Sequence, residues 1–83
     1  MSSNSMRDLL ELRSLIESGR AQELRESAGL SATALALDMG VNPSQVLRWE
    51  QKQRFPNGAN ARKYAKTLRR LADWEMARKG AAS

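Results

Sequence analysis

The sequence predicts an all-α protein, a compact domain of five helices around one small core. Three observations lead to this prediction. Apolar residues recur at helical spacing, and no segment shows the alternation typical of a strand. Two neighbouring segments, residues 19–28 and 32–39, each follow a serine that can cap a helix, and each is followed by a glycine. The 83 residues suffice for one domain with a modest core.

The first helix is expected over residues 6–17, and the capping box Ser5-Met-Arg-Asp8 would open it. Its apolar residues form a stripe too wide for a helix that is exposed on both sides. They are Met6, Leu9, Leu10, Leu12, Leu15 and Ile16. We favour burial of this extra N-terminal helix in the core, and a surface for a partner is the alternative.

A second helix is expected over residues 19–28. Ser18 can cap it, and Ala21, Leu24 and Ala28 would point inward. Gly29 is suited to the left-handed position that follows a helix, so the chain should turn there.

A third helix is expected over residues 32–39. Ser31 is a good N-cap, and Leu30 and Leu35 have the spacing of a hydrophobic staple. Gly40 ends this helix. A helix over residues 32–39 would therefore end just before a second capped and stapled helix N-terminus.

That second start opens a fourth helix, expected over residues 43–51. Asn42 is its N-cap, Pro43 takes the first helical position, and Gln45 would complete a capping box. Val41 and Val46 form the second staple. Two capped and stapled helix starts eleven residues apart predict two short helices joined by a tight turn.

The fourth helix has two different faces at 100° per residue. Val46 and Trp49 point to the core. The other face is mostly polar and carries Ser44, Leu47, Arg48 and Gln51. Such a helix can lie in a DNA major groove with its outer side chains near the bases.

A long C-terminal helix is expected over residues 58–78, after a basic loop. Its inward residues would be Ala61, Tyr64, Ala65, Leu68, Leu71 and Ala72. Trp49 and Tyr64 are expected in the core rather than stacked on bases. We divide the chain into an arm and extra helix (1–18), a DNA-binding domain (19–78) and a frayed tail (79–83), with residues 1–4 also frayed.

Composition narrows the function. The chain has no cysteine and no histidine, so no metal site, cofactor or enzymatic activity is expected. Residues 1–47 carry a net charge of −2 and residues 48–83 a net charge of +7, which suits a polyanionic partner as well as a solvated helix face. No membrane span or signal peptide is expected, so we place the protein in the cytoplasm.

The spacing of these residues matches a known family without a gap. The matching positions are Leu24-Arg25, Gly29-Leu30-Ser31, Leu35-Ala36, Gly40-Val41-Asn42, Val46, Trp49-Glu50, Pro56 and Tyr64-Ala65-Lys66-Thr67-Leu68. Over about residues 20–72 the chain resembles the lambda-repressor/Cro-like helix-turn-helix domains of phage and bacterial regulators. The Trp-Glu ending and the extra first helix resemble short actinobacterial and actinophage regulators.

The resemblance implies roles for particular residues. Positions Pro43, Ser44 and Arg48 match base contacts, and positions Ser31 and Asn42 match phosphate contacts at helix N-termini. Arg25 and Glu50 match a structural ion pair. Three positions depart from the family. Many relatives have glutamine in place of Ala32 and a polar, base-contacting residue in place of Pro43. Lys52 stands where glycine is common. Direct base readout should therefore depend heavily on Arg48.

Other contacts are expected from the residues themselves. The Arg48 guanidinium can bond to guanine O6 and N7, and Leu47 can meet a thymine methyl or pack on a neighbouring helix. Gln45 can contact phosphate or only complete its capping box. The remaining phosphate candidates, each of which could also be merely solvated, are Lys52, Arg54, Asn57, Arg62 and Lys63.

These observations predict a transcriptional regulator that binds double-stranded DNA, a Cro-like repressor that occupies an operator in a bacterial host cell. No small-molecule ligand is expected. The protein would be a weak homodimer through its outer helices, or a monomer that dimerises on DNA. The alternative is an antitoxin-like module that binds a protein partner and also its own operator. The apolar first helix and Trp74 would serve that alternative.

Overall fold

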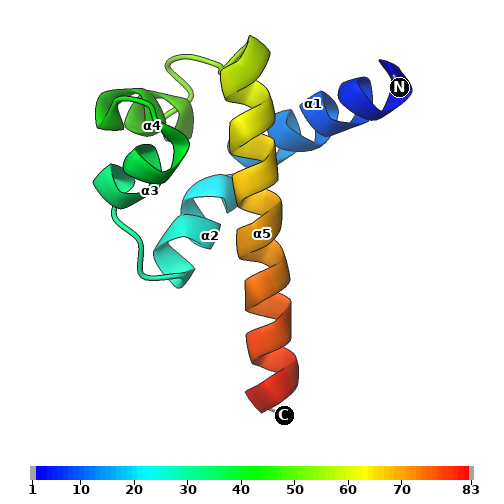
Figure 1. Ribbon diagram of the computed structural model, residues 1–83, viewed down its shortest axis with the longest axis vertical. Helices are drawn as coiled ribbons and strands as arrows, with labels where there is room; N and C mark the ends of the chain where they lie inside the picture. The colour runs from blue at the N-terminus through cyan, green and yellow to red at the C-terminus, as the bar shows by residue number, and fades with distance from the viewer. Residues whose placement is uncertain (1, 83) are drawn as a thin grey trace.

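The computed structural model describes residues 2–82, with side chains described for residues 6–80, and it confirms the all-α prediction (Figure 1). Within that range it contains five helices and no strand. The helices are α1 Ser2–Glu17, α2 Arg20–Ser27, α3 Ala32–Met39, α4 Pro43–Glu50 and α5 Gly58–Ala82.

The long helix α5 is the element against which the rest of the domain packs (Figure 1). Helices α1 and α2 both contact α5, and in the view of Figure 1 α1 lies on one side of α5 while α2 and the α3–α4 pair lie on the other. The beginning of α5 lies beside the α4–α5 loop, while its far end, near the C-terminus, extends beyond the other helices. The α3–α4 pair is therefore placed at an outer edge of the molecule.

The core draws side chains from all five helices. Trp49 of α4 and Tyr64 of α5 are both buried, as predicted, with ring centroids 5.0 Å apart. The buried apolar residues are Leu12, Ile16, Ala21, Leu24, Leu35, Ala36, Met39, Val46, Trp49, Ala61, Tyr64 and Leu68. Removal of these surfaces from water is the main stabilising contribution to a domain of this size.

Helix α1 is only half buried. Leu12 and Ile16, in its second half, are completely or almost completely buried. Met6 and Leu10, nearer its N-terminus, remain 65% and 61% exposed. The expectation that the whole apolar stripe belongs to the core is therefore wrong for Met6, Leu9 and Leu10.

Five helix ends differ from the sequence prediction, and two of these are the ends of α2 and α4, at Ser27 and Glu50, each one residue earlier than expected. Helix α1 begins at Ser2, so Ser5 is not its N-cap, and α5 continues to Ala82 where a frayed tail was expected. No proline interrupts either end, and the helical pattern simply continues. Helix α2 begins at Arg20 after Gly19, whose φ is +83°, and the Ser18 hydroxyl oxygen accepts a hydrogen bond from the Arg20 amide at 3.3 Å.

A buried carboxylate joins the far part of α5 to α2. Glu75 is only 5% exposed, and it forms an ion pair with Arg20 and a second one with Lys79 at 3.7 Å. The hydrogen bond with Arg20 lowers the pKa of Glu75 below its usual value, despite the opposing effect of burial. Nothing in the local sequence pattern predicted this contact, because the two partners are 55 positions apart.

Candidate nucleic-acid interface

Side chains close the first turns of both α3 and α4, as their caps predicted. The Ser31 hydroxyl oxygen accepts a hydrogen bond from the Ala34 amide at 3.0 Å. Asn42 Oδ1 accepts from the Ser44 amide at 3.2 Å and from the Ser44 hydroxyl at 3.1 Å. The Asn42 side chain therefore accepts from the Ser44 amide and not from the Gln45 amide, as the predicted capping box would require. The Ser44 side chain is held beside Asn42.

Helix α4 presents a polar outer face opposite a buried inner one. Val46, Trp49 and Glu50 are buried against the core. Ser44, Arg48 and Gln51 are exposed, and Leu47 is 42% exposed, so it does not pack fully on a neighbouring helix. Within the described residues the Arg48 side chain has no ion pair or hydrogen bond, so its five N–H donors are available to a ligand.

A buried ion pair fixes the orientation of α4. Arg25 Nε and Nη2 donate to the two Glu50 carboxylate oxygens at 2.6 and 2.9 Å, and both residues are less than 10% exposed. Arg25 Nη1 also donates to the Leu30 carbonyl at 2.8 Å. The hydrogen bonds to Glu50 raise the pKa of Arg25. One guanidinium thus joins α2, the α2–α3 turn and α4.

The distribution of ion pairs separates two kinds of basic residue. Arg20, Arg25 and Arg69 each contact a carboxylate, and the Arg69–Asp8 distance is 2.9 Å. The predicted phosphate contacts of the loop and of α5 are exposed and have no ion pair within the described chain. They are Lys52, Arg54, Arg62 and Lys63. Their positive charge is therefore not neutralised by the protein itself.

The loop between α4 and α5 brings further candidates to the same edge. Asn57 precedes α5, and its carbonyl accepts from the Ala61 amide at 3.2 Å, which makes Asn57 the N-cap residue. Gln45 is half-buried and lines a shallow hollow together with Arg54, Asn57 and Asn60. Gln45, Arg54 and Asn57 are thus brought together by the fold, although they come from three different segments.

Two contacts hold this loop in place, and the sequence did not predict either. Pro56 is buried. The Arg13 guanidinium of α1 lies over the Phe55 ring, 5.1 Å from its centroid. The extra helix α1 therefore supports the loop that carries several predicted contact residues. A Phe55–Arg13 pair 42 positions apart leaves no pattern in the sequence that could have revealed it.

Lys52 has a left-handed backbone, with φ +64°. It occupies the end of α4, where the Gln53 amide donates to the Arg48 carbonyl at 2.9 Å and the Lys52 amide donates to the Trp49 carbonyl at 3.1 Å. A residue with a Cβ is strained in this conformation. The lysine therefore occupies a backbone position that favours glycine.

Lys52→Gly is therefore expected to have opposite effects on stability and on DNA binding. Relief of the left-handed strain should raise the free energy of unfolding by about 1 kcal/mol, measured by urea denaturation. Loss of one phosphate contact should reduce the slope of log K against log salt by about 0.9. Gln53→Gly is the control, because its φ is not positive and the same change should destabilise the protein. An unchanged salt slope in Lys52→Gly would remove Lys52 from the interface.

The described residues hold no cluster of metal-ligating side chains. None of the helices in the described part of the chain is both long and apolar enough to cross a membrane. The buried Tyr64 hydroxyl forms no hydrogen bond with any described residue, and burial raises its pKa.

Two short capped helices, an outward polar face on the second one and unpaired cations beside it together define a DNA-binding helix-turn-helix domain. A model of the helix-turn-helix family matches residues 22–74, which is well over half of the chain. The chain belongs to this family, in its lambda repressor/Cro-like branch, and is a DNA-binding regulator. Comparison with curated proteins and with solved structures gave no match.

Proposed function

We propose that the protein is a sequence-specific repressor that binds duplex DNA by placing α4 in the major groove and occupying an operator, in the manner of a phage Cro protein. The observation that carries this proposal is the two-sided character of α4. Its inner face is buried and its orientation is fixed by the Arg25–Glu50 pair, while Arg48 is exposed and unpaired on the outer face. A fixed helix with a free arginine suits base readout.

In this proposal Ser44, Leu47 and Arg48 face the bases, with Pro43 at the entry of the helix into the groove. The capped N-termini at Ser31 and Asn42 and the N-terminus of α5 after Asn57 point their amides to phosphates. Gln45, Lys52, Arg54, Arg62 and Lys63 supply further phosphate contacts. Each neutralised phosphate adds to the salt dependence of binding.

In vitro selection of binding sites from random duplex DNA tests this function. The expected result is one enriched motif, and its symmetry reports how many copies of the protein bind it. Failure to enrich any motif, with binding that depends only on salt, would contradict sequence-specific regulation. A reporter gene placed behind the selected site then tests repression, which should be lost when the site is scrambled.

Arg62→Ala is expected to weaken binding to all DNA sequences by a similar factor. Arg62 is exposed on the first turns of α5 and has no ion pair, so the change removes charge and leaves the core intact. The slope of log K against log salt should fall by about 0.9. Affinities for the selected site and for a scrambled duplex at several salt concentrations measure this. A loss confined to the selected site would mean that Arg62 reads bases instead.

A further inference from the structure

Arg13 is an exposed cation of α1 that the described part of the chain does not neutralise. It forms no ion pair and no side-chain hydrogen bond with any described residue. Its guanidinium lies over the Phe55 ring, 5.1 Å from the ring centroid. The family model matches residues 22–74, so Arg13 lies outside it. Any role of Arg13 therefore belongs to the extra helix of this chain and not to the matched domain.

The contact with Phe55 holds the Arg13 guanidinium without occupying its hydrogen-bond donors. The ring attracts the cation as a whole, and the N–H groups keep no acceptor from the described protein. A long side chain that is already ordered loses less conformational freedom when it binds a ligand. Arg13 is thus ordered in advance, with free donors that suit two oxygen atoms of one phosphate group.

Phe55 separates two hollows on either side of the α4–α5 loop. The first, of about 330 Å³, lies between α1 and residues 55–58, and Arg13 lines it. The second, of about 250 Å³, lies toward α4 and is lined by three of the proposed phosphate contacts. They are Gln45, Arg54 and Asn57. Because Asn57 lines both hollows, Arg13 is continuous with the proposed phosphate contacts of the loop.

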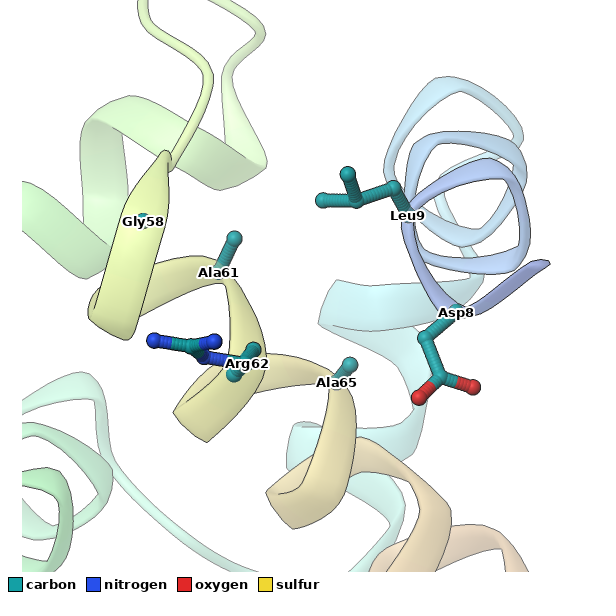
Figure 2. Close-up of a pocket in the computed structure, with 6 residues that line it drawn as sticks. All are labelled: Asp8, Leu9, Gly58, Ala61, Arg62 and Ala65. Atoms are coloured by element: carbon teal, nitrogen blue, oxygen red, sulfur yellow. The ribbon is translucent and has the colours of Figure 1, made fainter. Parts of the chain in front are cut away.

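The first turns of α5 also lie beside α1. Figure 2 shows Leu9 of α1 pointing toward Ala61 of α5. Arg62, another proposed phosphate contact, lines the hollow between these two helices. Helix α1 therefore borders the proposed phosphate contacts of the loop and those of α5 at the same time.

Arg7 provides a comparison on the same helix. It is exposed and has no ion pair within the described residues, as Arg13 does. It lies in an earlier turn of α1, no aromatic ring of the described chain lies against it, and it does not line the hollow beside the loop. The two arginines therefore have the same charge, but only Arg13 is held next to the proposed interface.

We propose that Arg13 binds a backbone phosphate of the duplex that α4 reads, an inference that rests on the proposed DNA-binding function. Phe55 is a positioning residue, because it holds the guanidinium beside the loop that the DNA backbone passes. The contact adds affinity and fixes the register of the protein on the duplex, and it carries no direct information about the bases. It extends the interface beyond the matched domain by one phosphate.

Ethylation interference on the selected site tests the contact directly. Ethylation removes the charge of one phosphate at a time and weakens binding where the protein contacts that phosphate. The wild type should show one interfering phosphate that Arg13→Gln no longer shows, while the other interfering positions remain. An identical set of interfering phosphates in the two proteins overturns the proposal.

The salt dependence of binding provides a second measurement. Arg13→Gln keeps a long polar side chain and removes the charge, so it should weaken binding to every duplex about two- to tenfold. The slope of log K against log salt should fall by about 0.9. Arg7→Gln is the matched control and should keep both the slope and the interference pattern of the wild type. An equal fall of the slope in both variants would show that only the net charge of α1 matters, which overturns the proposal.

Phe55→Leu tests the positioning role. It retains the charge of Arg13 and removes the ring, so the salt slope should stay unchanged while affinity falls about two- to fivefold. The double variant Arg13→Gln with Phe55→Leu should bind as Arg13→Gln alone does, because the ring acts only through the guanidinium. A full additional loss in the double variant would show that Phe55 acts independently of Arg13.

These outcomes are distinct from the test of the proposed function. If selection from random duplex DNA yields no motif, sequence-specific regulation fails, and the salt slope on any duplex still decides whether Arg13 meets phosphate. If a motif is selected and Arg13→Gln binds it as the wild type does, only the proposed role of Arg13 is lost.

Discussion

Arg48→Ala is expected to remove most of the sequence preference and to leave weak, salt-sensitive binding. Arg48 is exposed on the outer face of α4 and has no protein partner, so the change should not affect folding. A bidentate contact from arginine to guanine contributes about 1–3 kcal/mol of discrimination, which corresponds to about 5- to 150-fold in affinity. Competition between the selected site and single-base variants of it measures this loss.

Arg70→Ala is the matched control for that experiment. Arg70 is also exposed and unpaired in the described chain, but it lies on α5 beside the C-terminal end of α3 rather than on α4. The Arg70→Ala variant should lose some affinity for every duplex and keep the preference of the wild type for the selected site. If Arg48→Ala retains the full preference, base readout is carried by other residues, and the assignment of α4 as the reading helix must be revised.

Glu50→Leu is expected to destabilise the fold by about 3–5 kcal/mol, because it leaves the buried Arg25 guanidinium without its counter-charge. This is a large part of the stability of a small domain and could unfold it entirely. Urea denaturation followed by tryptophan fluorescence measures the change, since Trp49 is buried next to Glu50 in the chain.

A double variant keeps this prediction decisive even if the single variant does not fold. Arg25→Met with Glu50→Leu removes both charges and should recover most of the lost stability. Asp8→Asn, in the exposed pair with Arg69, should cost less than about 1 kcal/mol. A double variant as unstable as Glu50→Leu alone would show that the shape of the pair, rather than its charge balance, stabilises α4.

The parts of the fold that local chemistry determines could be predicted from the sequence. Residues 32–39 form α3 with the predicted bounds, and α4 begins at Pro43 as predicted, because caps and glycines act within a few residues. The core positions of Trp49 and Tyr64 also follow from periodicity. The DNA contacts themselves stay predictions, because they depend on a molecule outside the chain.

What could not be predicted depends on contacts between distant segments. The Arg20–Glu75 and Arg13–Phe55 pairs join residues more than 40 positions apart, and each partner is an ordinary charged or aromatic residue in its own segment. The exposure of Met6 and Leu10 was missed for a similar reason. An apolar stripe shows which face of a helix avoids water, but not how far along the helix its neighbours extend.

The hydrogen bond from Ser44 to Asn42 restricts the bases that α4 can recognise. The Ser44 hydroxyl already gives its proton to Asn42 Oδ1, so toward a ligand it can act only as an acceptor. An acceptor suits the amino groups of adenine and cytosine, whereas the donors of Arg48 suit the acceptors of guanine. We therefore expect the two side chains to have opposite preferences, and Asn42, which we propose as a phosphate contact, to influence the sequence that the protein selects.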